Sequence, residues 1–141
     1  MLSNYVLITG GSDGIGLELA KLFAKDKHNL LLAARNIEKL NKAKEMLKGE
    51  GVDVRIISVD LSSMEECEKL INYIEDNNLS VDTLVNNAGI GSFGEFKDIS
   101  WEKEEALIDI NIKALSKLTK HFLPTVSYTH LRAHETLSDL V

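Results

Sequence analysis

The stretch that decides the fold is Thr9-Gly10-Gly11-Ser12-Asp13-Gly14-Ile15-Gly16, which directly follows an apolar run at residues 5–8. Behind it, apolar residues recur at the spacing of one helix face: Ile15, Leu19, Leu22 and Phe23. The order is therefore strand, glycine-rich turn, helix. Such a turn directs backbone N–H groups and the positive end of a helix dipole at one spot, which suits a phosphate or pyrophosphate.

The glycines follow the spacing G-x-x-x-G-x-G, with Gly10, Gly14 and Gly16. We assign them three jobs: a tight turn, close approach of a ligand to the backbone, and close packing of the helix on the strand. A Walker-type phosphate loop is excluded because Leu17 and Glu18, not Lys and Ser or Thr, follow Gly16. A glycine turn that serves packing alone remains the alternative.

Apolar runs and amphipathic segments alternate along the rest of the chain. We expect strands at residues 5–9, 29–34, 54–59 and 83–86, and helices at 14–27, 37–48, 62–77 and 101–123. Asn36 is a plausible N-cap with Gly49 past the helix end, and the last helix should stop before Pro124. Its inward residues should be Leu107, Ile110, Ala114, Leu118 and Phe122. The pattern predicts an α/β fold with a doubly wound parallel sheet in the order 3-2-1-4.

The composition of the chain excludes several classes of protein. The chain has 141 residues, enough for one domain, and 44% of them are hydrophobic. A formal net charge of −6 argues against nucleic acid as a partner. No run has the length of a membrane span and no signal peptide is evident, so we expect a cytoplasmic protein. The single cysteine, Cys67, fits a buried helix position, and the histidines form no zinc pattern, so we expect no metal site.

Arg35 follows the second strand, 19 residues after Gly16. In dinucleotide-binding folds this position meets the adenosine ribose, where an acidic residue selects NAD and an arginine accommodates the 2′-phosphate of NADP. The nearest acidic residue, Glu38, lies one turn into the next helix. We therefore expect NADP(H) to be favoured over NAD(H), with a solvated loop arginine as the alternative.

Polar or small residues also close the third and fourth strands. Asp60, followed by Leu61, could accept a hydrogen bond from an adenine amine, or could simply cap the next helix. The stretch Asn86-Asn87-Ala88-Gly89 could fix the ligand edge of the sheet with its amides and leave room for a flat ring or sugar, or could be an ordinary turn.

Asn111 is an amide among apolar helix positions, with Leu107 four residues before it and Leu115 four after. A buried amide without partners costs about 1–3 kcal/mol, so its side chain needs hydrogen bonds. Either it holds a water in an active site, or a neighbouring carbonyl satisfies it.

Four motifs, in this order and spacing over about residues 3–124, resemble the short-chain dehydrogenase/reductase family. They are the glycine-rich turn at 9–16, Asp60-Leu61, the 86–89 stretch and Asn111. The resemblance implies a Rossmann-like fold, truncated here after the fourth helix. It implies that the cofactor pyrophosphate contacts Gly10, Ser12, Gly14, Ile15 and Gly16. It further implies that Asp60 and Leu61 contact adenine, that Asn87, Ala88 and Gly89 line the ribose and central sheet, and that Asn111 belongs to an Asn-Ser-Tyr-Lys catalytic set. Asp13 stands in the loop where some NADP-preferring members carry a basic residue, which leaves cofactor choice to Arg35.

The resemblance implies hydride transfer between NADP(H) and a small-molecule carbonyl or secondary alcohol, in a homo-oligomer. The family's Tyr-x-x-x-Lys pair is missing, because the tyrosines at 5, 73 and 128 are followed four residues later by Thr9, Asn77 and Arg132. Tyr128 lies only 17 residues after Asn111, too close for the intervening strand and its serine. We therefore expect a chain that is inactive by itself. A non-catalytic nucleotide-binding module is the alternative, and a methyltransferase is disfavoured by Asn111 and the 86–89 stretch.

The end of the chain differs from the rest. Residues 126–136 resemble a translation of sequencing-adapter DNA. We interpret residues 1–125 as the N-terminal part of the nucleotide-binding domain and residues 126–141 as a non-native or disordered tail.

Overall fold

The computed structural model describes residues 3–128 of the chain. Its elements are β1 (Asn4–Thr9), α1 (Gly14–Lys25), β2 (Asn29–Ala34), α2 (Ile37–Leu47), η1 (Lys48–Glu50), β3 (Val54–Ser58), α3 (Met64–Asp76), β4 (Ser80–Val85), η2 (Phe96–Asp98), α4 (Trp101–Ile108), η3 (Asp109–Ala114) and α5 (Leu115–Tyr128). Strands and helices therefore alternate as the sequence predicts.

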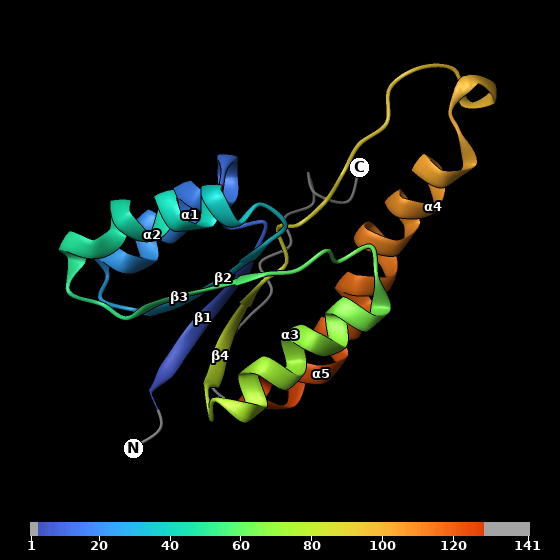
Figure 1. Cartoon of the computed structure of the whole chain (residues 1–141). Coiled ribbons are helices and arrows are strands. Elements are labelled where there is room, and N and C mark those ends of the chain that lie inside the picture. Colours follow the sequence, from blue (N-terminus) through green and yellow to red (C-terminus); the bar gives the residue numbers. More distant parts are fainter. Residues whose placement is uncertain (1–2, 129–141) are drawn as a thin grey trace, which may run out of the picture.

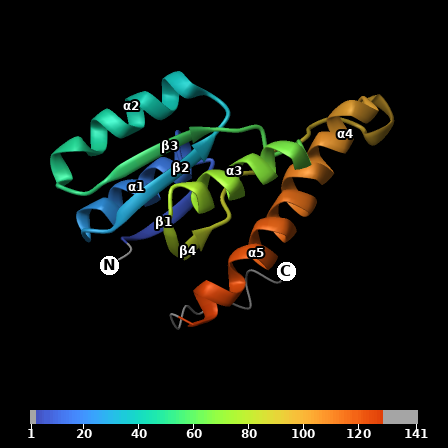
Figure 2. The ribbon, with the colours of Figure 1, turned by 60° about the horizontal axis from the view of Figure 1, so that its bottom comes forward.

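The four strands form one parallel sheet in the order β3-β2-β1-β4, which confirms the predicted topology. Helices α1 and α2 cover one face of the sheet, and α3 and α5 cover the other (Figure 1). Figure 2 shows the same two layers from a second direction, with α4 continuing from α5 beyond the end of the sheet. Because parallel strands share one direction, their carboxyl ends meet at one edge.

Residues of the two central strands alternate between two cores. Leu7 and Leu31 face the α3 and α5 side, whereas Ile8 and Leu32 face the α1 and α2 side. All four side chains are fully buried, and each such burial contributes about 1.5–3 kcal/mol. The sheet is thus fixed from both faces, which holds the carboxyl ends of β1 and β2 in place for the site.

Helix α1 packs on the sheet through small residues and not through all the apolar residues of the sequence pattern. Gly16, Ala20 and Ala24 are its buried residues, whereas Ile15 and Leu22 are 75% and 60% exposed. The apolar spacing therefore marks the helix but not its contact face, because no side chain fits at Gly16, where the helix begins beside the loop. Leu19 and Phe23 flank the contact and pack partly against the core.

Several element ends also differ from the predicted ones. Helix α2 ends at Leu47 and passes into η1, and Gly51, with φ +74°, takes the left-handed position expected of Gly49. Helix α3 begins after Ser63, whose Oγ accepts a hydrogen bond from the Glu66 N–H. The Glu66 carboxylate accepts from the backbone N–H of Asp60 and not from that of Ser63, so Ser63 and Glu66 do not form a capping box.

The predicted single helix at 101–123 is wrong in two respects. A π-helical turn, η3, separates α4 from α5 and contains Asn111. Helix α5 runs through Pro124 to Tyr128, because Phe122 and Val126 on either side of the proline pack against the core and offset the hydrogen bond that proline cannot make. Of the predicted inward residues, Ile110, Ala114, Leu118 and Phe122 are buried and Leu107 is half-buried.

The proposed tail at 126–141 lies largely outside the described residues. Positions 126–128 continue α5, and nothing further along the chain is described. Within residues 3–128, no helix combines the length and the apolar character that crossing a membrane requires.

A polar cluster of one buried and two partly exposed side chains lies at the other end of the sheet, where β1 and β3 begin. The Tyr5 hydroxyl, on a side chain only 3% exposed, donates to the Asp53 carboxylate. The Arg55 Nε donates to Asp53 Oδ2 at 3.0 Å and to the Tyr5 oxygen at 3.2 Å. Burial alone would raise the pKa of Asp53, but the hydrogen bonds from Tyr5 and Arg55 outweigh it and lower the pKa below the usual range.

This cluster predicts an acid-sensitive contribution to stability. Because the pKa of Asp53 is lower in the folded chain, its contribution is present above the ordinary aspartate pKa of about 3.9 and is lost as the pH falls through the lowered value. Tyr5→Phe should reduce the free energy of unfolding by about 1–2 kcal/mol at neutral pH. Urea denaturation at neutral pH and at about pH 3 checks both expectations, with exposed Asp98→Asn as the control. Asp53→Asn should lower the free energy of unfolding at neutral pH, and should lower it by less at about pH 3. An equal loss at both pH values would contradict a stabilising role of the ionised Asp53.

Candidate functional site

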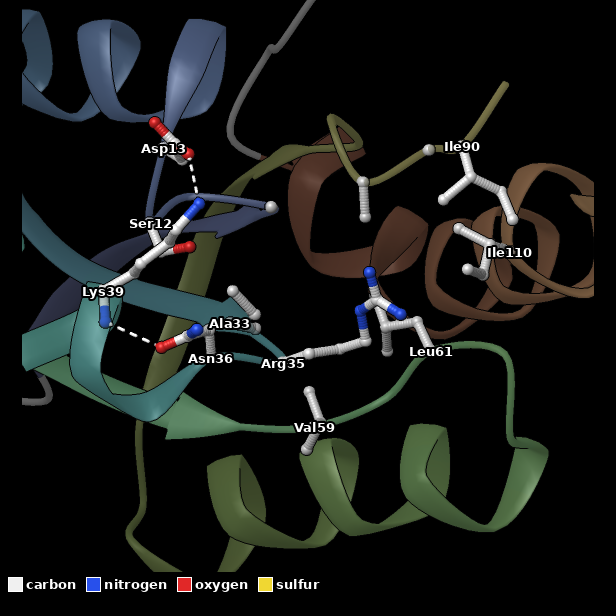
Figure 3. A pocket seen from close by; sticks show the side chains of 14 residues that line it. Ser12, Asp13, Ala33, Arg35, Asn36, Lys39, Val59, Leu61, Ile90 and Ile110 are labelled. Carbon is white, nitrogen blue, oxygen red and sulfur yellow. Dashed lines mark hydrogen bonds and ion pairs between the residues drawn. The ribbon is translucent and has the colours of Figure 1, made fainter. Parts of the chain in front are cut away.

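A cavity of about 390 Å³ opens at the carboxyl ends of the strands (Figure 3). It lies between the glycine-rich loop, the β2–α2 turn and the loop after β4. Its lining residues are Gly10, Ser12, Asp13, Ala33, Ala34, Arg35, Asn36, Lys39, Val59, Leu61, Ala88, Gly89, Ile90 and Ile110. This is the switch point between β1 and β4, where ligands of doubly wound sheets bind.

The glycine-rich loop needs glycine for both conformation and space. Gly10 and Gly14 have φ values of +64° and +53°, a region that other residues rarely adopt. A Cβ atom on Gly16 would lie 2.2 Å from the carbonyl oxygen of Gly10, so helix α1 can start this close to the loop only without a side chain. The predicted turn and packing jobs of these glycines are confirmed.

Thr9 and Asn87 tie the end of β1 to the end of β4. The Thr9 Oγ1 accepts hydrogen bonds from the N–H groups of Asn87 at 3.0 Å and Ala88 at 2.9 Å. In return, Asn87 Nδ2 donates to the carbonyl oxygens of Thr9 and Gly10, each at 3.1 Å. Asn87 therefore fixes the loop backbone, as the amide interpretation predicts, while the neighbouring Asn86 donates to Thr119 on α5.

Asn111 holds the loop that follows β4. Its Oδ1 accepts from the Ile90 N–H at 3.0 Å, and its Nδ2 donates to the Ile90 carbonyl at 2.8 Å. The side-chain amide is thus satisfied by neighbouring backbone, and it positions Gly89 and Ile90 against the cavity. The predicted role in holding a water is not tested by this geometry.

Asp60 is engaged in the turn before α3. Its Oδ1 accepts from the backbone N–H of Ser62 at 3.0 Å and from the Ser62 hydroxyl at 2.7 Å. The hydrogen bond from the Ser62 hydroxyl is the main reason that the pKa of Asp60 lies below its usual range. Its neighbours Val59 and Leu61 are buried and line the cavity, so they form the apolar part of the cavity wall at this strand end.

The structure brings a second cation to the cavity that sequence reasoning missed. Lys39 Nζ lies 2.6 Å from Asp13 Oδ2, and Asp13 Oδ1 accepts from the Gly14 N–H at 2.8 Å. Its position could have been inferred from Asn36, whose Oδ1 caps the Lys39 N–H at 3.0 Å and so fixes the first turn of α2 beside the loop. Arg35 extends into the cavity from the preceding turn (Figure 3).

The predicted site residues divide into two groups. Those that line the cavity are Gly10, Ser12, Asp13, Arg35, Leu61, Ala88 and Gly89. Those that stand outside its lining are Gly14, Ile15, Gly16, Asp60, Asn87 and Asn111. Among residues 3–128, no three His, Cys, Asp or Glu side chains gather where they could hold a metal ion.

The chemistry of this cavity fits a phosphorylated nucleotide. A Cβ atom on Gly14 would meet nothing within 4 Å, so apart from the capping carboxylate of Asp13 the start of α1 is open to a ligand. Arg35 and Lys39 supply positive charge at one side. Val59, Leu61 and Ile110 supply an apolar wall on which a flat base could lie.

Similarity to known proteins extends over most of the chain. Dehydrogenase/reductase SDR family member 4 of Bos taurus is 30% identical over 122 residues, covering 86% of this chain and 44% of that protein. Oxidoreductase UcpA of Salmonella typhimurium is 36% identical over 118 residues, covering 84% and 44%. The crystal structure of L-sorbose reductase from Gluconobacter frateurii, complexed with NADPH and L-sorbose, matches with a TM-score of 0.81 and 30% identity, covering 92% and 49%.

The chain thus spans a little under half the length of these relatives. The family model described as short chain dehydrogenase matches residues 4–132. The parallel sheet in the order 3-2-1-4 agrees with that match. The chain therefore belongs to the short chain dehydrogenase family.

Proposed function

We propose that this chain is the nucleotide-binding part of an oxidoreductase that uses NADP(H) in preference to NAD(H). The intact protein would transfer hydride between the nicotinamide and a small-molecule carbonyl or secondary alcohol. The observation that carries the proposal is the cavity at the strand ends, where the glycine-rich loop faces Arg35 and Lys39. The NADPH complex of the sorbose reductase adds support for the choice of cofactor.

The residues present divide the binding task by chemistry. Backbone N–H groups of the loop at residues 10–16 would hold the pyrophosphate at the start of α1. Arg35 would bind the 2′-phosphate, because a guanidinium matches phosphate in charge and geometry. Asp60 and Leu61 would border the adenine, and Ala88 and Gly89 would leave room for the ribose. When bound, the cofactor supplies or accepts the hydride.

Asn111 would act on catalysis through the loop that it holds. Its two bonds to Ile90 fix the backbone next to the cavity, where the reacting ring would lie. The tyrosine that gives the proton, its lysine and a serine would come from sequence that this chain does not contain. We infer a cytoplasmic protein that forms homo-oligomers when intact and takes no nucleic acid as partner.

A second candidate function is a nucleotide-binding module without catalysis. It is favoured by one observation, that the chain carries the binding residues but no Tyr-x-x-x-Lys. We expect the 141-residue chain to bind NADPH without oxidising it in the presence of ketones or aldehydes. The loss of NADPH absorbance, compared with a sample without protein, measures this. Oxidation proportional to the amount of chain would show that a proton donor is present after all.

Arg35 allows a direct test of cofactor choice. Arg35→Gln should weaken NADPH binding about 10- to 100-fold, because charged hydrogen bonds contribute about 1.5–3 kcal/mol. NADH binding should change by no more than about 2-fold, since NADH lacks the 2′-phosphate. Fluorescence titration with each nucleotide measures the two affinities. Lys42→Gln removes the same charge from an exposed position of α2 outside the cavity lining, and should leave both affinities unchanged.

The glycine-rich loop gives a prediction with a matched control. Gly16→Ala places a methyl group 2.2 Å from the Gly10 carbonyl oxygen and must displace the loop or the helix. NADPH and NADH should therefore both bind at least about 10-fold more weakly, and stability should fall by about 1–3 kcal/mol. Gly49→Ala adds the same methyl group where nothing lies within 4 Å, so its binding and stability should match the unchanged chain. Equal behaviour of the two variants would exclude this loop from the binding site.

A further inference from the structure

The mouth of the cavity carries an ion pair between the glycine-rich loop and α2. Asp13, at the N-cap of α1, faces Lys39 in the first turn of α2, and their charged atoms are 2.6 Å apart. Both residues line the cavity (Figure 3). The other Asp13 oxygen accepts from the Gly14 N–H at 2.8 Å. One carboxylate thus occupies an ammonium group and a helix-start N–H, which are the two kinds of group that bind phosphates.

Arg35 differs from Lys39 in its interactions. Among the described residues, no hydrogen bond or ion pair engages its guanidinium, although its charge acts on Asp60. The three charged side chains that line the cavity therefore carry one net positive charge, with Lys39 neutralised by Asp13. The Asp13 and Lys39 side chains are 67% and 53% exposed, so water and ions reach both of them. An exposed pair of this kind is weak enough for another anion to compete for the cation.

We propose that Asp13 is a specificity-determining residue that competes with the 2′-phosphate of the cofactor for Lys39. Its carboxylate holds Lys39 in the absence of ligand, and a 2′-phosphate has to displace it to gain a second cation beside Arg35. The chain then prefers a ribose with a 2′-phosphate over one without it by a smaller factor than it would if Arg35 and Lys39 were both free. This inference rests on the proposed function, because it concerns the same nucleotide site.

Two probes isolate the 2′-phosphate without any catalysis. Adenosine 2′,5′-bisphosphate and adenosine 5′-monophosphate differ only in that group, and calorimetric titration of the full chain gives their affinity ratio. Asp13→Asn removes the charge but keeps Oδ1 as an acceptor for the Gly14 N–H. We expect this variant to raise the ratio about 1.5- to 5-fold, the range for a solvent-exposed charge pair. Asp13→Ser, which also retains a capping oxygen, should do the same.

The route through Lys39 is tested by a double-mutant cycle. Lys39→Gln alone should lower the ratio, and Asp13→Asn should no longer raise it in the Lys39→Gln background. Glu18→Gln is the matched control, because it removes one charge from an exposed ion pair with Lys21 on the same helix α1, outside the cavity lining. Circular dichroism of each variant establishes that it is folded.

Each outcome decides something specific. An unchanged ratio in folded Asp13→Asn overturns the competition. A gain that persists in the Lys39→Gln background overturns the role of Lys39. Failure of the unchanged chain to bind either nucleotide overturns the proposed function together with this inference, whereas binding of both with the expected ratios supports the two.

Discussion

The site depends on the hydrogen bonds between Thr9 and Asn87. A single buried hydroxyl accepts two backbone N–H groups from the segment after β4, and the Asn87 amide returns two bonds to the end of β1. Without these bonds, several polar groups at the ends of two strands would need other partners at the edge of the core. The ends of β1 and β4 are held at a fixed separation, and the cavity lies between the loops that leave them.

Close approach of α1 to the sheet is the second constraint. Its contact face consists of Gly16, Ala20 and Ala24, which bury little area themselves but let the helix axis come near β1. The start of α1, where Asp13 caps the Gly14 N–H, is thereby placed directly beside the cavity. The exposed position of Ile15 is the consequence of the same geometry, since a helix that turns its small residues inward must turn that side chain to solvent.

The sheet could be predicted well from the sequence because β1 and β2 are continuous apolar runs, which only a two-sided core accommodates. Gly10, Gly14 and Gly16 likewise predicted the turn, since few other functions need that spacing. The Asn36 cap could have placed the first turn of α2, but not the ion pair of Lys39 with Asp13, because that contact joins residues 26 positions apart. The role of Asn111 was open for a similar reason: a polar residue in a helix indicates that a partner is required but not which one.

The helix around Pro124 shows where local rules fail. A proline predicts a helix end because it removes one backbone bond, but the burial of Phe122 and Val126 is a property of the tertiary structure. The π-helical turn at Asn111 is equally invisible to a period of 3.6 residues. Both departures occur in the one helical segment that has to reach from the core to the loop after β4.

Thr9 and Asn87, which join β1 to β4, lie far apart along the chain, and this affects the order of folding. Strands β1 and β2, and β2 and β3, are linked by short units that can pair while the chain is still largely open. Thr9 and Asn87 are 78 residues apart, so their bonds close the longest loop in the sheet. We expect this pairing to form late in folding, after the α1 and α2 side of the sheet. A nucleotide that binds between the joined strand ends would then bind only chains in which β4 has already paired with β1, the last step of folding.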